Sequence, residues 1–238
     1  MDGTRAGSLV AVGVGPGDPE LLTLKAVKAL QGADVILAPK ASREGGSVAA
    51  GIVAPHLDPE RQELREQLYP MRKDPAELEQ FWRDAAQEVA ELLAGGRRVA
   101  FVTLGDPYLY STFLYLRRFL LEQMPKARVE VISGLSSIQA AAAAADLPLA
   151  LADERVAILP ATFEDGRLRQ TLEQFDTVVL MKVARVFGRV KELLRELDLL
   201  QSAVYVRQVG LPQEAIWHNL DAVDEDDLHY LSLIIVKK

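Results

Sequence analysis

Short β-rich stretches alternate with helical patterns through the first 146 residues, and this alternation limits the chain to few folds. The stretches comprise residues 8–15, 34–40, 64–70, 98–105 and 129–134. Strands that alternate with helices are typical of parallel βαβ units. Two of the stretches contain continuous apolar runs, at residues 9–12 and 99–102, as strands covered on both faces do. The sequence therefore predicts an α/β fold with a largely parallel five-stranded sheet.

The pattern changes after residue 149. Further strand-like stretches lie at residues 155–160, 177–182, 203–210, 214–220 and 230–238. Helical patterns fill the first two connections, whereas Leu211, Pro212 and Gln213 form a predicted hairpin loop. We therefore predict a mixed sheet in a second α/β domain. The predicted division gives an N-terminal domain of residues 1–146 and a C-terminal domain of residues 147–238.

Composition excludes several classes of function. The 27 lysines and arginines stand against 34 acidic residues, and a net charge of -7 does not favour binding of a nucleic acid. The absence of cysteine excludes disulfides, thiolate catalysis and cysteine-based zinc sites. His56, His218 and His229 lie far apart in the sequence, so we expect no protein-bound metal.

No targeting or membrane segment is recognisable. The apolar run at residues 9–14 is short and rich in glycine, unlike a signal sequence. The longest uncharged stretch, residues 131–145, is shorter than the roughly 18 residues that span a bilayer. We therefore expect a cytoplasmic protein that does not contact a membrane.

The first predicted strand leads into a glycine-rich turn, residues 13–19, with the sequence Gly-Val-Gly-Pro-Gly-Asp-Pro. Asp18 can cap a helix that we predict over residues 20–30, and Pro19 suits the first position of that helix. Three glycines at alternate positions allow a backbone to pass close to a ligand, and the free N–H groups of a helix start would face that ligand.

Two later turns repeat this design. Residues 104–107, Leu-Gly-Asp-Pro, precede a helix predicted over residues 108–121, and residues 133–137, Ser-Gly-Leu-Ser-Ser, precede an alanine-rich helix. All three turns follow strands of a parallel sheet, so they should share its carboxyl edge, where open α/β folds bind ligands. Each turn alone could equally be no more than a well-capped helix start. Together the three turns predict a binding site.

Several nucleotide sites do not fit these turns. A dinucleotide fingerprint would need a third glycine where Asp18 stands, and an acidic residue where the second strand ends in Pro39 and Lys40. A phosphate loop needs a Gly-Lys pair, which the sequence lacks. The usual Rossmann-like methyltransferases carry an acidic residue in the first strand, at the position of Ala11.

The turns at residues 13–18, 105–107 and 133–137, in this order and spacing, resemble those of the tetrapyrrole methylase family over nearly the whole chain. Within the family, residues 104–112 resemble the precorrin-2 and cobalt-factor II C20-methyltransferases. The uroporphyrinogen III methyltransferases instead carry Phe-Gly-Arg at the positions of Tyr110, Ser111 and Thr112.

The resemblance implies a class III methyltransferase: two α/β domains, with S-adenosylmethionine in a cleft between them and S-adenosylhomocysteine as the product, in a homodimer. By position, the implied cofactor contacts are Pro16, Leu104, Gly105, Asp106, Leu109, Ser136, Ser137, Met181 and Gly210, many of them through backbone atoms. From the residues alone, Met181 could instead fill the core at a strand end, and Gly210 could be an ordinary turn residue.

The implied reaction is methylation of carbon 20 of a tetrapyrrole in cobalamin biosynthesis. Methyl transfer itself needs no strong base, but a proton must later leave carbon 20. Asp106, Tyr108 and Tyr110 are the polar candidates for that step, and none is assigned. Whether the substrate is cobalt-factor II or metal-free precorrin-2 stays open, and cobalt would arrive inside the substrate.

The substrate carries carboxylates that basic side chains could bind. The candidates are Lys40, Arg43, Arg72, Lys73, Arg185 and Arg207, although each could be an ordinary surface residue. Arg185 and Arg207 are favoured because a guanidinium pairs well with a carboxylate. Two alternatives remain: a tetrapyrrole methylase that acts at another ring position, and a non-catalytic cofactor-binding module.

Overall fold

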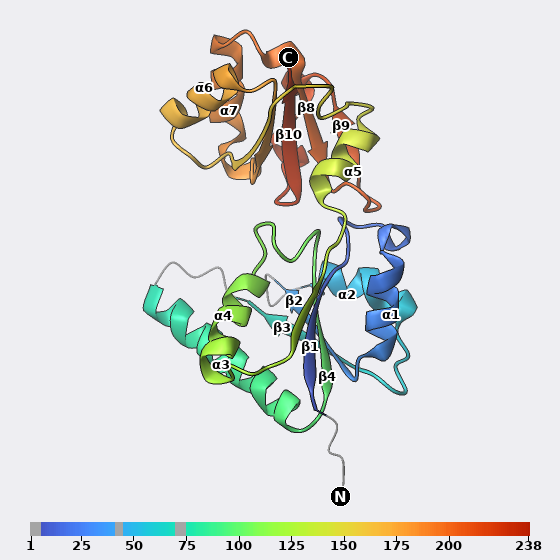
Figure 1. Ribbon diagram of the computed structural model, residues 1–238. Helices are drawn as coiled ribbons and strands as arrows, with labels where there is room; N and C mark the ends of the chain where they lie inside the picture. Colours follow the sequence, from blue (N-terminus) through green and yellow to red (C-terminus); the bar gives the residue numbers. More distant parts are fainter. Residues whose placement is uncertain (1–5, 41–44, 70–74) are drawn as a thin grey trace, which may run out of the picture. The chain divides into compact units, whose positions relative to one another are not determined.

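The computed structural model describes residues 6–40, 45–69 and 75–238 (Figure 1). The chain divides into two units, Met1–Ser136 and Ser137–Lys238. This division falls before helix α5 (Ser137–Ala144), whereas the boundary predicted between residues 146 and 147 falls after that helix. Within the described residues, no helix is both long and apolar enough to cross a membrane.

The first unit contains the predicted five-stranded sheet. Its strands are β1 (Ser8–Gly13), β2 (Val35–Lys40), β3 (Glu63–Leu68), β4 (Arg98–Thr103) and β5 (Val129–Ile132). They lie in the order β3-β2-β4-β1-β5, and every neighbouring pair is parallel. The predicted fold class is confirmed for this unit.

Helices cover both faces of this sheet, which explains why its central strands are apolar throughout. Helices α1 (Leu24–Gly32) and α2 (Val48–Val53) lie on one face, and α3 (Pro75–Ala94) and α4 (Phe113–Gln123) lie on the other (Figure 1). In β4, Val99 and Phe101 pack in the α3 and α4 core, while Ala100 and Val102 pack in the core with α1 and α2. Alternate side chains of a strand point to opposite faces, so both sets are buried.

Two helices begin later than the sequence predicts. Asp18 caps only a short 3-10 turn, Pro19–Leu21, by accepting a 2.8 Å hydrogen bond from Glu20 N, so the predicted helix over residues 20–30 is wrong at its start. Helix α1 follows with Thr23 as its cap, because the Thr23 hydroxyl accepts from Ala26 N at 3.1 Å. Helix α4 likewise begins at Phe113 and not at residue 108.

The second unit contains a mixed sheet, as predicted. Its strands are β6 (Val156–Pro160), β7 (Thr177–Met181), β8 (Ala203–Arg207), β9 (Ala215–Trp217) and β10 (Ser232–Lys237), in the order β6-β7-β10-β8-β9. Strand β10 is antiparallel to both β7 and β8, and β8 and β9 form the predicted antiparallel hairpin.

One face of this second sheet packs against α6 (Asp165–Gln174) and α7 (Phe187–Glu196). Fully buried Tyr205 of β8 belongs to that core, and the centre of its ring lies 5.3 Å from the centre of the Phe187 ring. Short 3-10 turns complete the unit at Ala184–Val186, Leu200–Ser202, Leu220–Ala222 and Glu225–Asp227; in the first unit, Ala54–His56 forms another.

Candidate functional site

The three predicted turns meet at the carboxyl edge of the first sheet. They follow β1, β4 and β5, which are neighbours in the sheet. Val14 N donates to Thr103 O at 3.0 Å, and Gly105 N donates to Gly15 O at 2.8 Å. Gly15 and Gly105 thereby form an isolated antiparallel bridge just beyond the parallel strands. The first and second turns are thus joined through their backbones.

The third turn packs against the other two through glycines. A Cβ atom added to Gly13 would lie 2.5 Å from Gly134 N and 2.6 Å from Gly105 O, too close for any side chain. A Cβ atom on Gly134 would overlap the same backbone of Gly105 and Gly13. These three glycines therefore allow three loops to come into direct backbone contact.

Gly105 has more space around its Cα than Gly13 and Gly134 have. Its φ of +64° lies in the left-handed region that favours glycine. The atom nearest to a Cβ on Gly105 would be Ser136 Cα, at 3.8 Å, so this side of the turn has room for one more atom. Gly105 is half-buried and has this room beside its Cα, whereas protein backbone fills the corresponding space at Gly13 and Gly134.

Asp106 connects the second turn to the third. One carboxylate oxygen accepts from Tyr108 N at 2.8 Å, and the other accepts from Gly134 N at 3.1 Å. Both oxygens therefore bind backbone N–H groups, one local and one on the neighbouring loop. This geometry gives Asp106 a structural role in the turns and makes it a poor candidate for the group that removes a proton from a substrate.

The segment between Asp106 and α4 carries the two tyrosine candidates. Tyr108 and Tyr110 are 55% and 47% exposed, and Tyr110 has a φ of +53°. The buried Ser111 hydroxyl accepts from Phe113 N at 3.2 Å and lies 3.0 Å from Thr103 Oγ1. This hydroxyl pair lies next to the start of α4. Ser111 and Thr103 are not among the predicted site residues, although a serine two residues before a helix is a recognised turn signal.

The remaining predicted cofactor residues of the first unit lie close to the turns in the sequence. Pro16 and Ser136 are buried, whereas Leu104 and Leu109 are half-buried. Leu109 N donates to Asp106 O at 3.3 Å, which places it in the same turn. Ser137 is the first residue of α5 and so belongs to the second unit.

Met181 and Gly210 lie at one edge of the second sheet. Met181 ends β7 and pairs with Leu233 of β10, which pairs on its other side with Val206 near the end of β8. Gly210 follows β8 with a φ of +77°, and its N–H donates to Glu214 Oε2 at 2.7 Å. The structure therefore brings these two positions to the same edge within their unit, and it also makes Gly210 a turn residue.

The predicted carboxylate-binding side chains differ in their partners. Arg207 Nη1 lies 3.0 Å from Asp227 Oδ1, and the Arg207 guanidinium lies 5.1 Å from the centre of the Trp217 ring. Lys40 Nζ lies 3.9 Å from Glu66 Oε2, and Arg185 is an exposed residue. Arg207 therefore has a structural ion pair already. Arg43, Arg72 and Lys73 lie outside the described residues.

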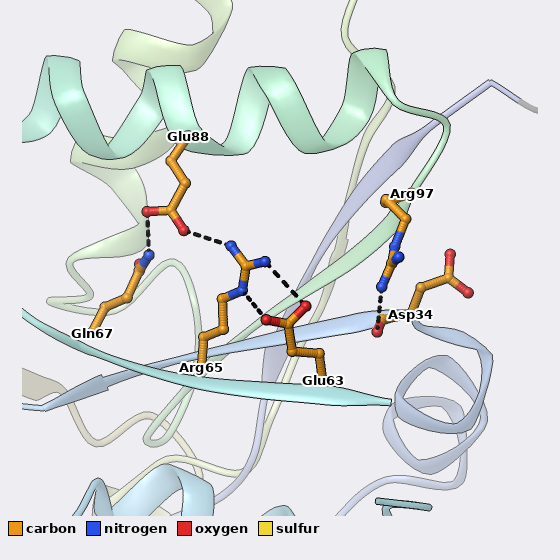
Figure 2. Close-up of polar contacts among 6 residues, drawn as sticks. All are labelled: Asp34, Glu63, Arg65, Gln67, Glu88 and Arg97. Carbon is orange, nitrogen blue, oxygen red and sulfur yellow. Dashed lines mark hydrogen bonds and ion pairs between the residues drawn. The ribbon is translucent and has the colours of Figure 1, made fainter. Parts of the chain in front are cut away.

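The amino edge of the first sheet, opposite the three turns, is stabilised by charged side chains. The Arg98 guanidinium donates to Asp34 Oδ1 at 2.8 Å, and its hydrogen bonds hold the pKa of Asp34 at about 2, below the usual 3.8. Arg97 Nη2 donates to Asp34 O at 3.4 Å (Figure 2). Two hollows of about 410 and 460 Å³ lie here and share Arg98 in their walls. Neither is lined by a residue of the three turns.

A further charged cluster lies on edge strand β3, away from the turns. Arg65 binds Glu63 through Nε at 2.7 Å and Glu88 of α3 through Nη1 at 2.9 Å, and Gln67 also donates to Glu88 (Figure 2). The hydrogen bond from Arg65 lowers the pKa of Glu63.

Across residues 6–40, 45–69 and 75–238, no group of three or more acidic, histidine or cysteine side chains could hold a metal ion.

Comparison with known proteins gives consistent matches over the whole chain. Residues 8–223 match the family model of the tetrapyrrole (corrin/porphyrin) methylases. The cobalt-precorrin-2 C(20)-methyltransferase of Salmonella typhimurium is 37% identical over 234 residues, which cover 98% of this chain and 97% of that protein. The precorrin-2 C(20)-methyltransferase of Sinorhizobium sp is 36% identical over 245 residues, which cover 99% and 97%.

A solved structure agrees with the fold. The uroporphyrin-III C-methyl transferase from Thermus thermophilus, complexed with S-adenyl homocysteine, is 25% identical to this chain. The superposition has a TM-score of 0.66 and covers 97% of each chain. The predicted fold class is therefore confirmed by an experimental structure as well as by the sheet topology.

Proposed function

Since the chain belongs to the tetrapyrrole (corrin/porphyrin) methylases, we propose that it methylates carbon 20 of a precorrin-2-type tetrapyrrole in cobalamin biosynthesis. The observation that carries this proposal is identity of 36–37% to two C(20)-methyltransferases over nearly the full length of each protein. These matches cover almost all of both domains. We therefore expect this chain to share its substrate-binding residues with the two relatives.

The chain is an S-adenosylmethionine-dependent methyltransferase. The turns at the carboxyl edge of the first sheet fit such a cofactor, because they offer closely packed backbone and an open side at Gly105. When bound, S-adenosylmethionine would supply a methyl group on a positively charged sulfur, and the C–S bond would break as an electron-rich ring carbon bonds to the methyl carbon, leaving a neutral thioether. For the methyl transfer itself, the residues of this chain need only hold and align the two reactants, a contribution for which effective molarities reach roughly 10⁵ M or more.

We propose that the cofactor contacts are those expected from the family. In the first unit these are Pro16, Leu104, Gly105, Asp106, Leu109 and Ser136; in the second they are Ser137, Met181 and Gly210. The role of Asp106 in this proposal is to fix the turn through Tyr108 N and Gly134 N. The packing of Gly13, Gly105 and Gly134 supports the proposed cofactor contacts, because the loops would present N–H and carbonyl groups to the cofactor without interfering side chains.

The finer assignments are also proposals. The cobalt-containing and the metal-free precorrin-2 forms are both candidate substrates, since relatives named for each match almost equally well. We propose a homodimer, which the family resemblance implies, and sedimentation equilibrium at several concentrations tests it. A cytoplasmic location stays a prediction.

The function is tested by transfer of an isotopically labelled methyl group. The protein is incubated with methyl-labelled S-adenosylmethionine and, in parallel, with cobalt-factor II and with precorrin-2. We expect label on carbon 20 of one product, located by NMR. Label at another ring carbon would place the enzyme elsewhere in the family, and label that never leaves the cofactor would favour a non-catalytic binding module.

Binding provides a separate test of the cofactor. S-adenosylmethionine and S-adenosylhomocysteine should each raise the unfolding temperature, because a ligand that binds only the folded state stabilises it. A shift with NAD or ATP, and none with either of these two, would contradict the proposal.

A further inference from the structure

Tyr110 has a backbone conformation that its residue type disfavours. Within the described parts of the chain, positive φ angles occur at six residues other than glycine: Tyr110, Asp146, Ala152, Lys182, Asp198 and Gln208. Asparagine and aspartate tolerate this region, whereas for a bulky aromatic residue it is a true outlier. The conformation at Tyr110 therefore needs a local explanation.

Ordinary capping explains some of the other five positions but not Tyr110. Asp146 and Asp198 lie two residues after the ends of α5 and α7, and the next residues, Leu147 and Leu199, donate back to Ala142 O and Leu194 O at 2.9 and 2.8 Å. This is the usual hydrogen-bond pattern of a left-handed residue after a helix. Tyr110 instead precedes a helix, where no such pattern applies.

Contacts on both sides hold Tyr110 in place. On its amino side, Asp106 fixes Tyr108 N and Gly134 N. On its carboxyl side, the buried Ser111 hydroxyl binds Phe113 N and lies 3.0 Å from the hydroxyl of Thr103, the last residue of β4. The surrounding structure thus over-determines the turn. Strain that is maintained in this way tends to occur where a side chain must be positioned for function.

Three tyrosines near this turn are partly exposed to solvent. Three of the six tyrosines in the chain lie between residues 108 and 115. Tyr115 stacks on Trp82 of α3, with ring centres 5.5 Å apart and planes at 19°. Tyr108, Tyr110 and Tyr115 are 55%, 47% and 52% exposed, and the first two lie on the turn that contains Gly105. They are flat, partly apolar side chains beside the proposed cofactor turn.

We propose that Tyr110, with Tyr108 beside it, binds the flat face of the tetrapyrrole, and that the strained backbone at Tyr110 serves to position its ring. This inference rests on the proposed function for its ligand. A macrocycle presents a broad π surface with its carboxylates at the rim, and an aromatic ring packs well against such a surface. Tyr110 is then a positioning residue for the substrate and not the group that accepts the proton from carbon 20.

The test compares Tyr110→Gly with Tyr110→Phe. Binding of a metal-free porphyrin with eight carboxylates is followed by its fluorescence, and KM and kcat are measured with the true substrate. Tyr110→Gly should weaken porphyrin binding and raise KM by about tenfold through loss of ring packing. Tyr110→Phe keeps the ring and should remain within about twofold of the native protein.

Two further measurements separate substrate binding from folding. Affinity for S-adenosylhomocysteine, measured by calorimetry, should be unchanged in Tyr110→Gly, and its unfolding temperature should be unchanged or higher, since glycine accepts a positive φ. Asp198→Gly is the matched control, because it also places glycine at a left-handed position but lies after α7. It should leave porphyrin binding intact. Tyr110→Asn, which also tolerates this conformation, replaces the glycine variant if that variant does not fold.

The outcomes distinguish this inference from the proposed function. Native-like porphyrin binding by Tyr110→Gly would overturn the inference, and so would a loss in Tyr110→Phe as large as that in Tyr110→Gly. A native protein that binds the porphyrin but does not methylate carbon 20 would overturn only the proposed function. A native protein that binds no tetrapyrrole would overturn both.

Discussion

The two edges of the first sheet are built by different means. At the carboxyl edge, Gly13, Gly105 and Gly134 bring three loops into backbone contact, with Asp106 as the connecting carboxylate. At the amino edge, the loops and strand starts are joined by charged side chains, above all by Asp34 with Arg98. A site that must present backbone groups to a ligand has little space for side chains, whereas an edge without a ligand can be stabilised by ion pairs. The comparison predicts that mutations at the two edges should have different consequences.

The largest effect is expected for Gly134→Ala at the carboxyl edge. Its Cβ would overlap Gly105 O and Gly13 C, so the loops must separate. We expect a loss of about 3 kcal/mol in the free energy of unfolding, typical of severe overpacking, together with loss of S-adenosylhomocysteine binding. Urea unfolding and calorimetry measure the two quantities. Gly51→Ala is the control, since nothing lies within 4 Å of its added Cβ. Native behaviour of Gly134→Ala would show that the loops do not need this contact.

Asp106→Ala should have the next largest effect. The change leaves Tyr108 N and Gly134 N without their acceptor, at an expected cost of about 2 kcal/mol. Because the second and third turns lose this hydrogen bond, affinity for S-adenosylhomocysteine should fall by more than the change in stability alone explains. The matched control is Asp58→Ala, which removes a similar bond, Glu60 N to Asp58 Oδ1, near the amino edge. Equal cofactor affinity in the two variants would contradict the comparison.

Asp34→Ala tests the amino edge, where the effect should be on stability alone. We expect a loss of about 1 kcal/mol in the free energy of unfolding at pH 7, since the pair is partly exposed to solvent, with kcat and KM unchanged.

The pKa of Asp34 is lowered from 3.8 to about 2 in the folded protein. The contribution of Asp34 to the free energy of unfolding is therefore complete above about pH 4 and is lost as the pH falls toward 2. Urea unfolding of both proteins over this pH range measures the difference. A difference that grows on acidification would contradict the assignment.

Arg65→Ala on edge strand β3 should give the smallest change. The Arg65 side chain is about a third exposed and its partners Glu63 and Glu88 are more exposed, so the ion pairs contribute little. We expect the unfolding temperature to stay within about 2 °C of the native value and methyl transfer to be unaffected. Differential scanning calorimetry and the labelled-methyl assay test this. A larger loss of activity than in Asp34→Ala would link the β3 cluster to the site.

The sequence contained most of the fold because the relevant signals are local. Continuous apolar runs such as residues 99–102 identified strands covered on both faces, and the predicted parallel direction of the strands placed the three glycine turns at one edge. Helix starts were less predictable, because Asp18 and Thr23 are both good caps and only the structure shows that Thr23 begins α1.

Contacts between distant residues could not be predicted. The carboxylate of Asp106 binds Gly134 N, 28 positions away in the sequence, and no pattern in either segment indicates that bond. Arg207 was a candidate for binding substrate, yet Asp227 and Trp217 already contact its guanidinium. The strained Tyr110 likewise depends on a hydroxyl of the preceding strand, Thr103, which the local sequence does not reveal.

Amide hydrogen exchange with and without S-adenosylhomocysteine tests the central claim most directly, because it reports on both edges of the first sheet in one experiment. We predict slower exchange on ligand addition at residues 14–18, 104–110 and 134–137, with no change around Asp34 and Arg98. Protection confined to the amino edge, or no protection in the three turns under saturating ligand, would contradict the account.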